Sequence, residues 1–237
     1  MAIDYTKRPA ADPTPPAAPP TAPSPAATRV TLTKAAPSVS LTKRGGSRGT
    51  LRVNLQWNAR PDGAPAPAPP RGLLKRLQGP APSGDIDLDL ACMYEYADGS
   101  KGVVQALGGT LRDQSVGAPL CWLDGDDRSG AAADGENLYV DLSRVTEIKR
   151  ILVFAFIYEG VANWAGADAV VTLHPASGPQ IEVRLDEHDP QANMCAIAML
   201  ENDGGELGVA RQMRYVRGHR DLDEAYGWGM RWSAGRK

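Results

Sequence analysis

The sequence predicts an all-β fold, an antiparallel β-sandwich that follows a disordered Pro/Ala-rich N-terminal tail. Short stretches of alternating apolar and polar residues recur about every ten residues, separated by Gly, Asp and Pro turns, which is typical of sandwiches. No window carries the sustained period of 3.6 residues that an amphipathic helix would show. Both observations favour sheets over helices.

Proline sets the expected boundaries. Nine of the 20 prolines precede Val39, and seven more lie between Pro61 and Pro82. Segments of Pro, Ala, Thr and Ser bury too little apolar area to offset chain entropy. We therefore expect a disordered tail at residues 1–27 and a sandwich domain at 28–237, with a Pro-rich loop inserted at 61–84.

The domain is expected to open with a small repeat, because Val30-Thr-Leu-Thr-Lys34 recurs as Val39-Ser-Leu-Thr-Lys43. The alternation predicts a pair of short strands separated by a turn at 35–37. The segment Ile151–Ile157 is apolar at every position, which predicts a central strand covered on both faces. The further expected strands are 51–57, 86–94, 120–123, 138–142, 150–158, 169–173, 180–185, 194–200, 207–215 and 228–232.

Charge, cysteines and hydropathy exclude several classes of protein. The net charge of −2 gives no field that would attract nucleic acid. Cys92, Cys121 and Cys195 are an odd number at wide spacing, which fits buried thiols in a reducing compartment. The longest apolar stretch, Ile151–Tyr158, is far shorter than the roughly 20 residues of a membrane span. We expect a soluble, cytoplasmic protein.

Acidic residues provide the most informative chemistry, beginning with Asp85, Asp87 and Asp89. Residues two apart on a strand share a face, so these carboxylates point one way while Ile86, Leu88 and Leu90 point into the core. Neighbouring carboxylates on one face repel each other, and a bound cation or cationic partner strand relieves the repulsion.

A second acidic cluster begins at Asp124-Gly-Asp-Asp-Arg-Ser-Gly130 and continues through Asp134-Gly-Glu136. Such a loop can supply the six to eight oxygens that Ca²⁺ prefers, although acidic turns are often simply solvated. The spacing is not that of an EF-hand, and Cys and His ligands for zinc are missing. Calcium is favoured, with magnesium as the alternative ion.

At this point the chain resembles the tellurium-resistance TerD family. The resemblance covers roughly residues 28 to 232, and the ending Arg217-Gly-His-Arg with Ile157-Tyr-Glu-Gly160 is closer to the TerA-like branch. The motifs that carry it are, in order, the twin repeats, Leu51-Arg-Val-Asn-Leu-Gln-Trp57, Asp85-Ile-Asp-Leu-Asp89, Gly125-Asp-Asp-Arg-Ser-Gly130 and Asp134-Gly-Glu136. The family implies a β-sandwich, one or two bound calcium ions, stress assemblies with other tellurium-resistance proteins near the membrane, and no established reaction.

The resemblance also implies ligands. The metal ligands carried over are Asp85, Asp87, Asp126, Asp127, Asp134 and Glu136, with backbone oxygens of Arg128 and Gly130; Asp89, Asp124 and Glu159 are additional candidates. Two positions depart from the family pattern. Asp127 replaces a common Asn, and Gly135 stands where another carboxylate is expected, which weakens a second ion site.

The inserted loop contains a short basic, amphipathic element, in which Leu73, Leu74 and Leu77 accompany Lys75 and Arg76 at helical spacing. It either packs on its own domain or contacts a partner protein or the inner face of the membrane.

Aromatic and basic residues gather near the end of the chain. Tyr215, Tyr226, Trp228 and Trp232 are expected to be sandwich core or edge cover, with a ligand-stacking platform as the alternative. The series Arg211, Arg214, Arg217 and Arg220 indicates a solvated face or a contact to a phosphate-like ligand.

Three function classes compete. The first is a calcium-dependent, non-enzymatic scaffold or sensor that acts through partner proteins. The second is a Mg-dependent hydrolase or phosphotransferase that uses the same carboxylates; it would need a general base and a phosphate-binding cation, and only Arg128 is placed to serve. Direct tellurite reduction would need vicinal thiols, and no Cys-x-x-Cys motif is present. His174, His188 and His219 are scattered, which argues against a catalytic triad.

Overall fold

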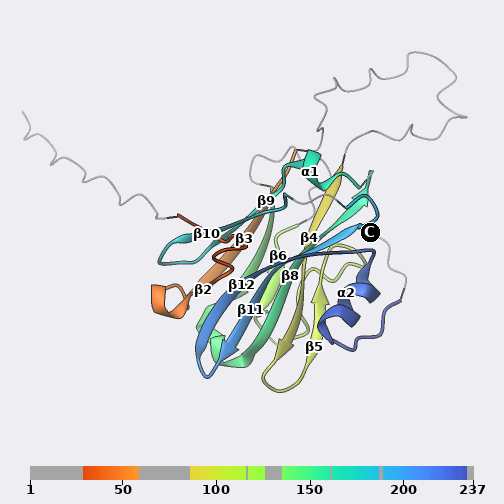
Figure 1. Cartoon of the computed structure of the whole chain (residues 1–237). Helices are drawn as coiled ribbons and strands as arrows, with labels where there is room; N and C mark the ends of the chain where they lie inside the picture. The colour runs from red at the N-terminus through yellow and green to blue at the C-terminus, as the bar shows by residue number, and fades with distance from the viewer. Residues whose placement is uncertain are drawn as a thin grey trace, which may run out of the picture.

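Two six-stranded sheets form the protein (Figure 1). The computed structural model describes residues 29–58, 86–115, 117–125, 135–160, 162–186 and 189–233. The strands are β1 (Arg29–Thr31), β2 (Ser38–Ser40), β3 (Thr50–Gln56), β4 (Asp87–Tyr96), β5 (Lys101–Val104), β6 (Cys121–Leu123), β7 (Glu136–Asp141), β8 (Ile148–Glu159), β9 (Val170–His174), β10 (Gln180–Arg184), β11 (Met194–Asp203) and β12 (Glu206–Val216). The helices are η1 (Thr42–Arg44), η3 (Leu142–Glu147), α1 (Trp164–Ala167) and α2 (His219–Tyr226).

The strand order is β1-β10-β9-β3-β7-β6 in the first sheet and β2-β12-β11-β8-β4-β5 in the second. Every pairing within the sheets is antiparallel except β1 with β10, which is parallel. The predicted all-β sandwich is therefore confirmed.

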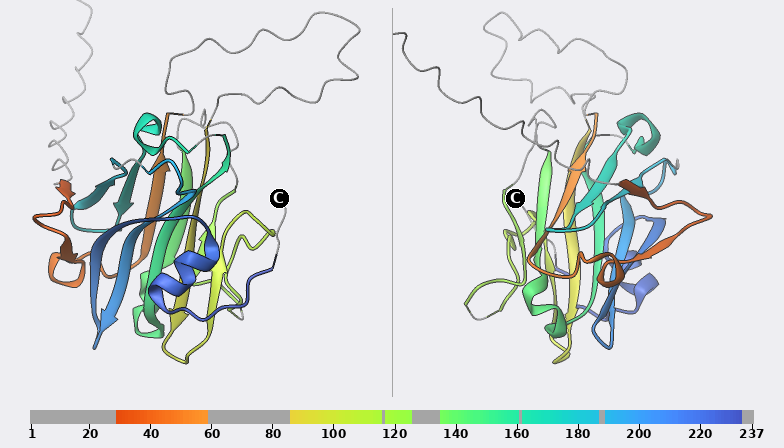
Figure 2. Two further views of the ribbon diagram at one scale, coloured as in Figure 1. Left: turned by 45° about the vertical axis from the view of Figure 1, so that its right-hand side comes forward. Right: turned by 90° about the vertical axis from the view of Figure 1, so that its left-hand side faces the viewer.

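Strand β8 is the predicted central strand, and it lies between β11 and β4. Alternate residues enter two clusters: Ile151 and Val153 face the other sheet, whereas Leu152 and Phe154 face outward. The outer cluster is covered by Leu222 of α2 and by Trp228, so α2 packs against the outer face of the second sheet (Figure 2). Burial on both faces explains the unbroken apolar sequence.

The twin repeats form the two predicted short strands, β1 and β2, which lie in opposite sheets and pair with β10 and β12. Two other local features differ from the prediction. Residues 228–232 form no strand, because Gly227 and Gly229 adopt positive φ angles of 61° and 74° that break an extended run. The pattern also gave no sign of α2, an eight-residue helix in which only Leu222 and Asp223 are buried.

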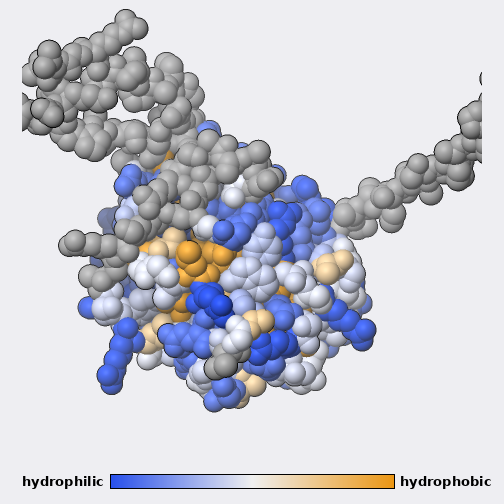
Figure 3. Space-filling view, turned by 180° about the vertical axis from the view of Figure 1, so that it is seen from behind, coloured by the Kyte–Doolittle hydropathy of each residue, from blue (hydrophilic) through white to orange (hydrophobic). Residues whose placement is uncertain are grey.

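No helix in the described ranges combines the length and apolar character that crossing a bilayer requires. Seen from behind, the surface is mostly hydrophilic, with a small apolar patch near its centre (Figure 3).

Candidate functional site

The two acidic segments of the sequence attach at the same end of the sandwich. Strand β3 ends and strand β4 begins at this end. The Trp57 indole N–H, just after β3, donates to the carbonyl oxygen of Ile86, just before β4, at 2.9 Å. Strand β7 begins at the same end, because Glu136 is the register partner of Leu55 near the end of β3. The described residues that flank 59–85 and 126–134 therefore lie at the same end of the fold.

Three predicted carboxylates are buried at this end, although charged side chains usually lie in solvent. Asp87 and Asp89 lie on β4, with exposed fractions of 7% and 0%, and Glu136 on β7 is 4% exposed. Glu136 joins the two sheets, since its Oε2 accepts a hydrogen bond from the Leu90 amide at 2.6 Å. Ile86, Leu88 and Leu90 face the inter-sheet core, as the alternation predicted.

Of the three additional candidates, Asp89 is buried, whereas Asp124 and Glu159 are placed differently. Glu159 is exposed at the end of β8, and it is the register partner of Asp87, so two carboxylates are neighbours across the strands. Asp124 is exposed just after β6, and its Oδ2 accepts hydrogen bonds from the Asn137 amide at 3.0 Å and the Tyr139 hydroxyl at 3.2 Å. Asp124 therefore has a structural role within the first sheet.

The remaining predicted ligands lie outside the described residues: Asp85, Asp126, Asp127, Arg128, Gly130 and Asp134. So does the loop element with Leu73, Leu74, Lys75, Arg76 and Leu77. Within the part of the chain that the structure describes, no group of three or more His, Cys, Asp or Glu side chains could hold a metal ion. A metal site at this end would thus need oxygens from the two acidic segments.

Gly135 departs from the family pattern for a steric reason. Its φ is +60°, and a Cβ atom built on it would lie 2.1 Å from the Leu55 carbonyl oxygen. Such a contact is far inside van der Waals distance, so no side chain fits without moving β3 or β7. The close packing of β3 against Gly135 therefore leaves no room for a carboxylate at this position.

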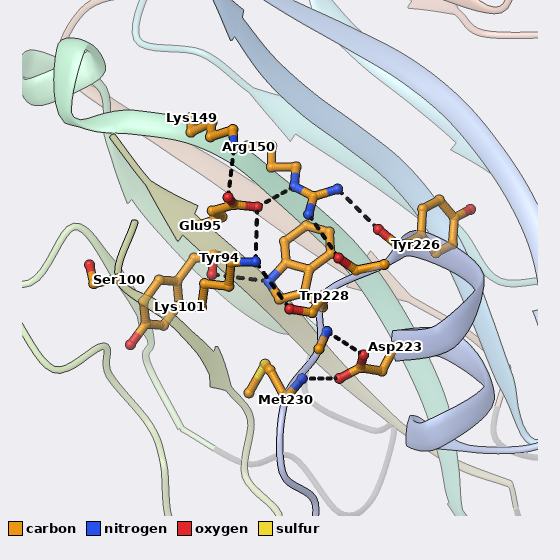
Figure 4. Close-up of polar contacts among 12 residues, drawn as sticks. Tyr94, Glu95, Ser100, Lys101, Lys149, Arg150, Asp223, Tyr226, Trp228 and Met230 are labelled. Atoms are coloured by element: carbon orange, nitrogen blue, oxygen red, sulfur yellow. Dashed lines mark hydrogen bonds and ion pairs between the residues drawn. The ribbon is translucent and has the colours of Figure 1, made fainter. Parts of the chain in front are cut away.

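A second polar centre, which the sequence analysis did not predict, lies on the outer face of the second sheet (Figure 4). Glu95 of β4 is 4% exposed and binds Lys149 Nζ through Oε1 at 2.7 Å and Arg150 Nε through Oε2 at 2.6 Å. Lys101 Nζ lies 3.7 Å from Oε2. Burial by itself would raise the pKa of Glu95, but hydrogen bonds from Lys149 and Arg150 outweigh it and lower the pKa to about 2.

This cluster fastens the C-terminal segment to the sheet. Arg150 stacks on the Trp228 ring at 3.9 Å and donates to the Tyr226 carbonyl oxygen at 3.0 Å. The Trp228 indole donates to the Tyr94 carbonyl oxygen at 3.1 Å. Glu95, as the one charged residue of the run 90–96, was the signal available in the sequence, but its partners Lys149 and Arg150 lie 54 and 55 residues away in the chain.

Two cysteines with no motif between them also meet in the core. Cys92 on β4 and Cys121 on β6 are both fully buried and face the space between the sheets. The neighbouring Cys121 thiol and burial raise the pKa of Cys92 well above its ordinary value. Thiols that are buried and protonated are poor nucleophiles. This pair gives no accessible redox centre.

Comparison with known proteins supports the class of protein that the sandwich and its acidic end define. No protein-family model matches the chain. The chain is 44% identical over 209 residues to a tellurium resistance protein, TerA of an Alcaligenes species. The match covers 88% of this chain but 58% of TerA, so the chain spans less than two thirds of that relative. The predicted relationship to the tellurium-resistance TerD/TerA-like family is confirmed.

One solved structure shares the fold, and a second was compared with it. The crystal structure of a protein of unknown function named SAV2460 has a TM-score of 0.52 and 14% identity, over 75% of this chain and 95% of that one. A homologue of the telluride resistance protein TerD from Streptomyces coelicolor A3(2) has a TM-score of 0.47 and 17% identity, over 74% of this chain and 95% of its own.

Proposed function

We propose that the protein is a calcium-binding, non-enzymatic component of tellurium resistance and general stress response that acts through partner proteins. The observation that carries the proposal is the burial of Asp87, Asp89 and Glu136 at one end of the sandwich, next to the points where Asp85 and the acidic loop 126–134 join the described strands. The TerA relative, which is named as a tellurium resistance protein, supplies the biological setting.

The physical argument concerns charge. Asp87 has Glu159 as its register partner, and the sequence places Asp85 two residues before Asp87 and Asp126, Asp127 and Asp134 between β6 and β7. Like charges in close contact repel, whereas Ca²⁺ accepts six to eight oxygens at roughly 2.3–2.6 Å and compensates them. The proposed ligands are Asp85, Asp87, Asp126, Asp127, Asp134 and Glu136 with the carbonyl oxygens of Arg128 and Gly130, for one or two ions.

Calcium would then act as an ordering switch. An ion shared between strand carboxylates and loop carboxylates links the two segments, so a surface for other tellurium-resistance or stress proteins forms in the loaded state. Cys92 and Cys121 are fully buried, which leaves tellurite no access to their thiols and favours a binding role.

The test is thermal unfolding of the metal-free protein as Ca²⁺ or Mg²⁺ is added. Binding to the folded state stabilises it by RT ln(1 + [Ca²⁺]/Kd), about 2.7 kcal/mol at one hundred times Kd. The double substitution Asp126→Asn and Asp127→Asn should remove most of this stabilisation, whereas Asp203→Asn, at the exposed last residue of β11, should not. Absence of any calcium effect on the wild type at millimolar concentration would refute the proposal, and a stronger effect of Mg²⁺ would favour the magnesium enzyme instead.

Partner or membrane contact has its own test. Replacing Leu73, Leu74 and Leu77 with serine, beside the cations Lys75 and Arg76, should reduce co-sedimentation with anionic vesicles or with co-expressed resistance proteins while the melting temperature stays constant. A large loss of stability would instead show that the leucines belong to the core.

A further inference from the structure

A cleft in the described part of the chain lies away from the acidic end. It has a volume of about 740 Å³ and separates the turn after β5 from the start of α2 and the last described residues. Its walls come from 103–110, 217–221 and 230–233. We propose that this cleft binds a small phosphorylated compound with a planar ring, a ligand class that is independent of the calcium site.

Three arginines supply the attraction for an anion. Arg217, Arg220 and Arg231 line the cleft and are exposed. In the described ranges no carboxylate lies within 4.0 Å of their guanidinium groups, whereas most other arginines of the sheets have an ion pair or a ring partner. Asp221 is the one acidic residue in the lining, so the cleft keeps an excess of positive charge. Guanidinium groups bind phosphate oxygens in bidentate geometry.

The arginine series noted in the sequence divides into two pairs that lie in different surroundings. Arg211 lies 3.6 Å from Asp186, and Arg214 stacks on the Tyr226 ring at 5.8 Å, so both have partners within the protein. Arg217 and Arg220 follow the end of β12 and line the cleft; Arg217 donates one long hydrogen bond, at 3.5 Å, to the neutral Gln191 side chain. The positive charge at the cleft therefore follows from where Arg217 and Arg220 lie in the fold, and the three-residue spacing of the series does not predict it.

Trp232 gives the cleft a flat aromatic surface. Its indole N–H donates to Asp223 Oδ2 at 2.8 Å, and its ring centroid lies 4.8 Å from that of His219. Val103, Leu107 and Met230 add apolar surface to the same cleft. An aromatic ring held by a hydrogen bond at its edge leaves a face for stacking, which is how flat ligands are commonly bound.

Polar groups that could orient the ligand are also fixed. His219 Nε2 lies 2.8 Å from Gln105 Oε1, and its ring packs edge-on against Phe154 and Phe156. Burial lowers the pKa of His219, so it is neutral near pH 7 and adds no charge of its own. A volume of this size suits a ligand as large as a mononucleotide.

The test uses AMP as the probe, with adenosine and inorganic phosphate as its two halves, in EDTA so that calcium binding cannot contribute. Calorimetry should give a Kd for AMP between about 10 μM and 1 mM, and each half should bind at least about tenfold more weakly. AMP should shift the indole ¹H–¹⁵N resonance of Trp232, assigned with Trp232→Phe. Raising the salt concentration should weaken binding, because the rim charges are exposed.

The variants decide whether this cleft is responsible. Arg220→Gln with Arg231→Gln should weaken AMP binding at least about tenfold at constant melting temperature, because two charge-assisted contacts are lost. Arg48→Gln, at an exposed position in another part of the fold, is the matched control and should leave the Kd unchanged. The proposal is overturned if AMP does not bind at 5 mM (about five times the weakest expected Kd), if inorganic phosphate binds as tightly as AMP, or if the double variant binds like the wild type.

Discussion

Arg150 Nε lies 2.6 Å from Glu95 Oε2 while the guanidinium of the same arginine lies 3.9 Å from the centre of the Trp228 ring. One side chain therefore joins β4, β8 and the segment that follows α2. Trp228 is 1% exposed and belongs to the outer apolar cluster, so the stacking of Arg150 on Trp228 helps to cover the outer face of the second sheet.

Replacing Glu95 with glutamine should destabilise the fold by about 2 kcal/mol, since three cations lose their charged acceptor. The pKa of Glu95 falls from an ordinary 4.5 to about 2 in the folded state. Its contribution is therefore fully present above pH 4.5 and is lost as the pH falls from 4.5 towards 2. Urea unfolding at pH 7, 4 and 2.5 should show that the wild type and Glu95→Gln become similar in stability at low pH.

The exposed ion pair between Arg144 and Glu147, at 2.7 Å, provides the control. Glu147→Gln should change the free energy of unfolding at pH 7 by less than about 0.5 kcal/mol, because solvated pairs contribute little. Equal effects of the two substitutions would show that the Glu95 cluster has no special role.

Asp223 organises the chain after α2, and Asp223→Ala should release it. Its carboxylate accepts hydrogen bonds from the Gly229 and Met230 amides and from the Trp232 indole, at 2.7–2.8 Å. Loss of these acceptors should make trypsin cleave after Arg231 several-fold faster in the folded protein, because local opening becomes less costly. Exposed Asp221→Ala should leave the cleavage rate unchanged, and equal protection of both variants would contradict the assigned role.

How far the sequence predicts this protein depends on how local the determinants are. Strand β8 was predicted because burial on both faces makes its consecutive residues apolar, a pattern that is visible in one short segment. Strands β1 and β2 have strand patterns, but their partners β10 and β12 lie more than 140 residues away, so local patterning could not assign them to opposite sheets.

The candidate sites differ in the same way. Asp87, Asp89 and Glu136 were recognisable because family motifs and strand alternation mark them, and the structure places them at one end. The Glu95 cluster and the cleft at α2 assemble residues from distant segments. Trp232 and Arg220 were noted as residues, but their shared cleft requires the turn at Gly227 and Gly229 that returns the chain to the sheet.

Gly135→Asp would restore the carboxylate that the family pattern leads one to expect, and it should destabilise the protein instead of creating an ion site. Any Cβ here lies 2.1 Å from the Leu55 carbonyl oxygen, and the φ of +60° disfavours a side chain. We expect a loss of more than about 2 kcal/mol and no gain in calcium affinity. Gly125→Ala, whose Cβ would have no atom within 4 Å, should be nearly neutral. Tighter calcium binding by folded Gly135→Asp would refute the steric explanation.

The last prediction concerns the thiols, because it separates a binding protein from a direct reductant. Cys92, Cys121 and Cys195 are fully buried, and the pKa of Cys92 is raised by Cys121 and by burial. Near the first two, Asp113 accepts hydrogen bonds from the Cys121 amide at 2.9 Å and the Tyr96 hydroxyl at 2.5 Å, so the local polar groups are engaged with each other. In native buffer at pH 7.5 the three thiols should react with Ellman's reagent only as fast as the protein opens, at least about a hundredfold slower than in denaturant. Tellurite should leave the thiol count unchanged under the same native conditions. Rapid native labelling, or a loss of two thiols on exposure to tellurite, would show that Cys92 and Cys121 are accessible and would return direct reduction to consideration.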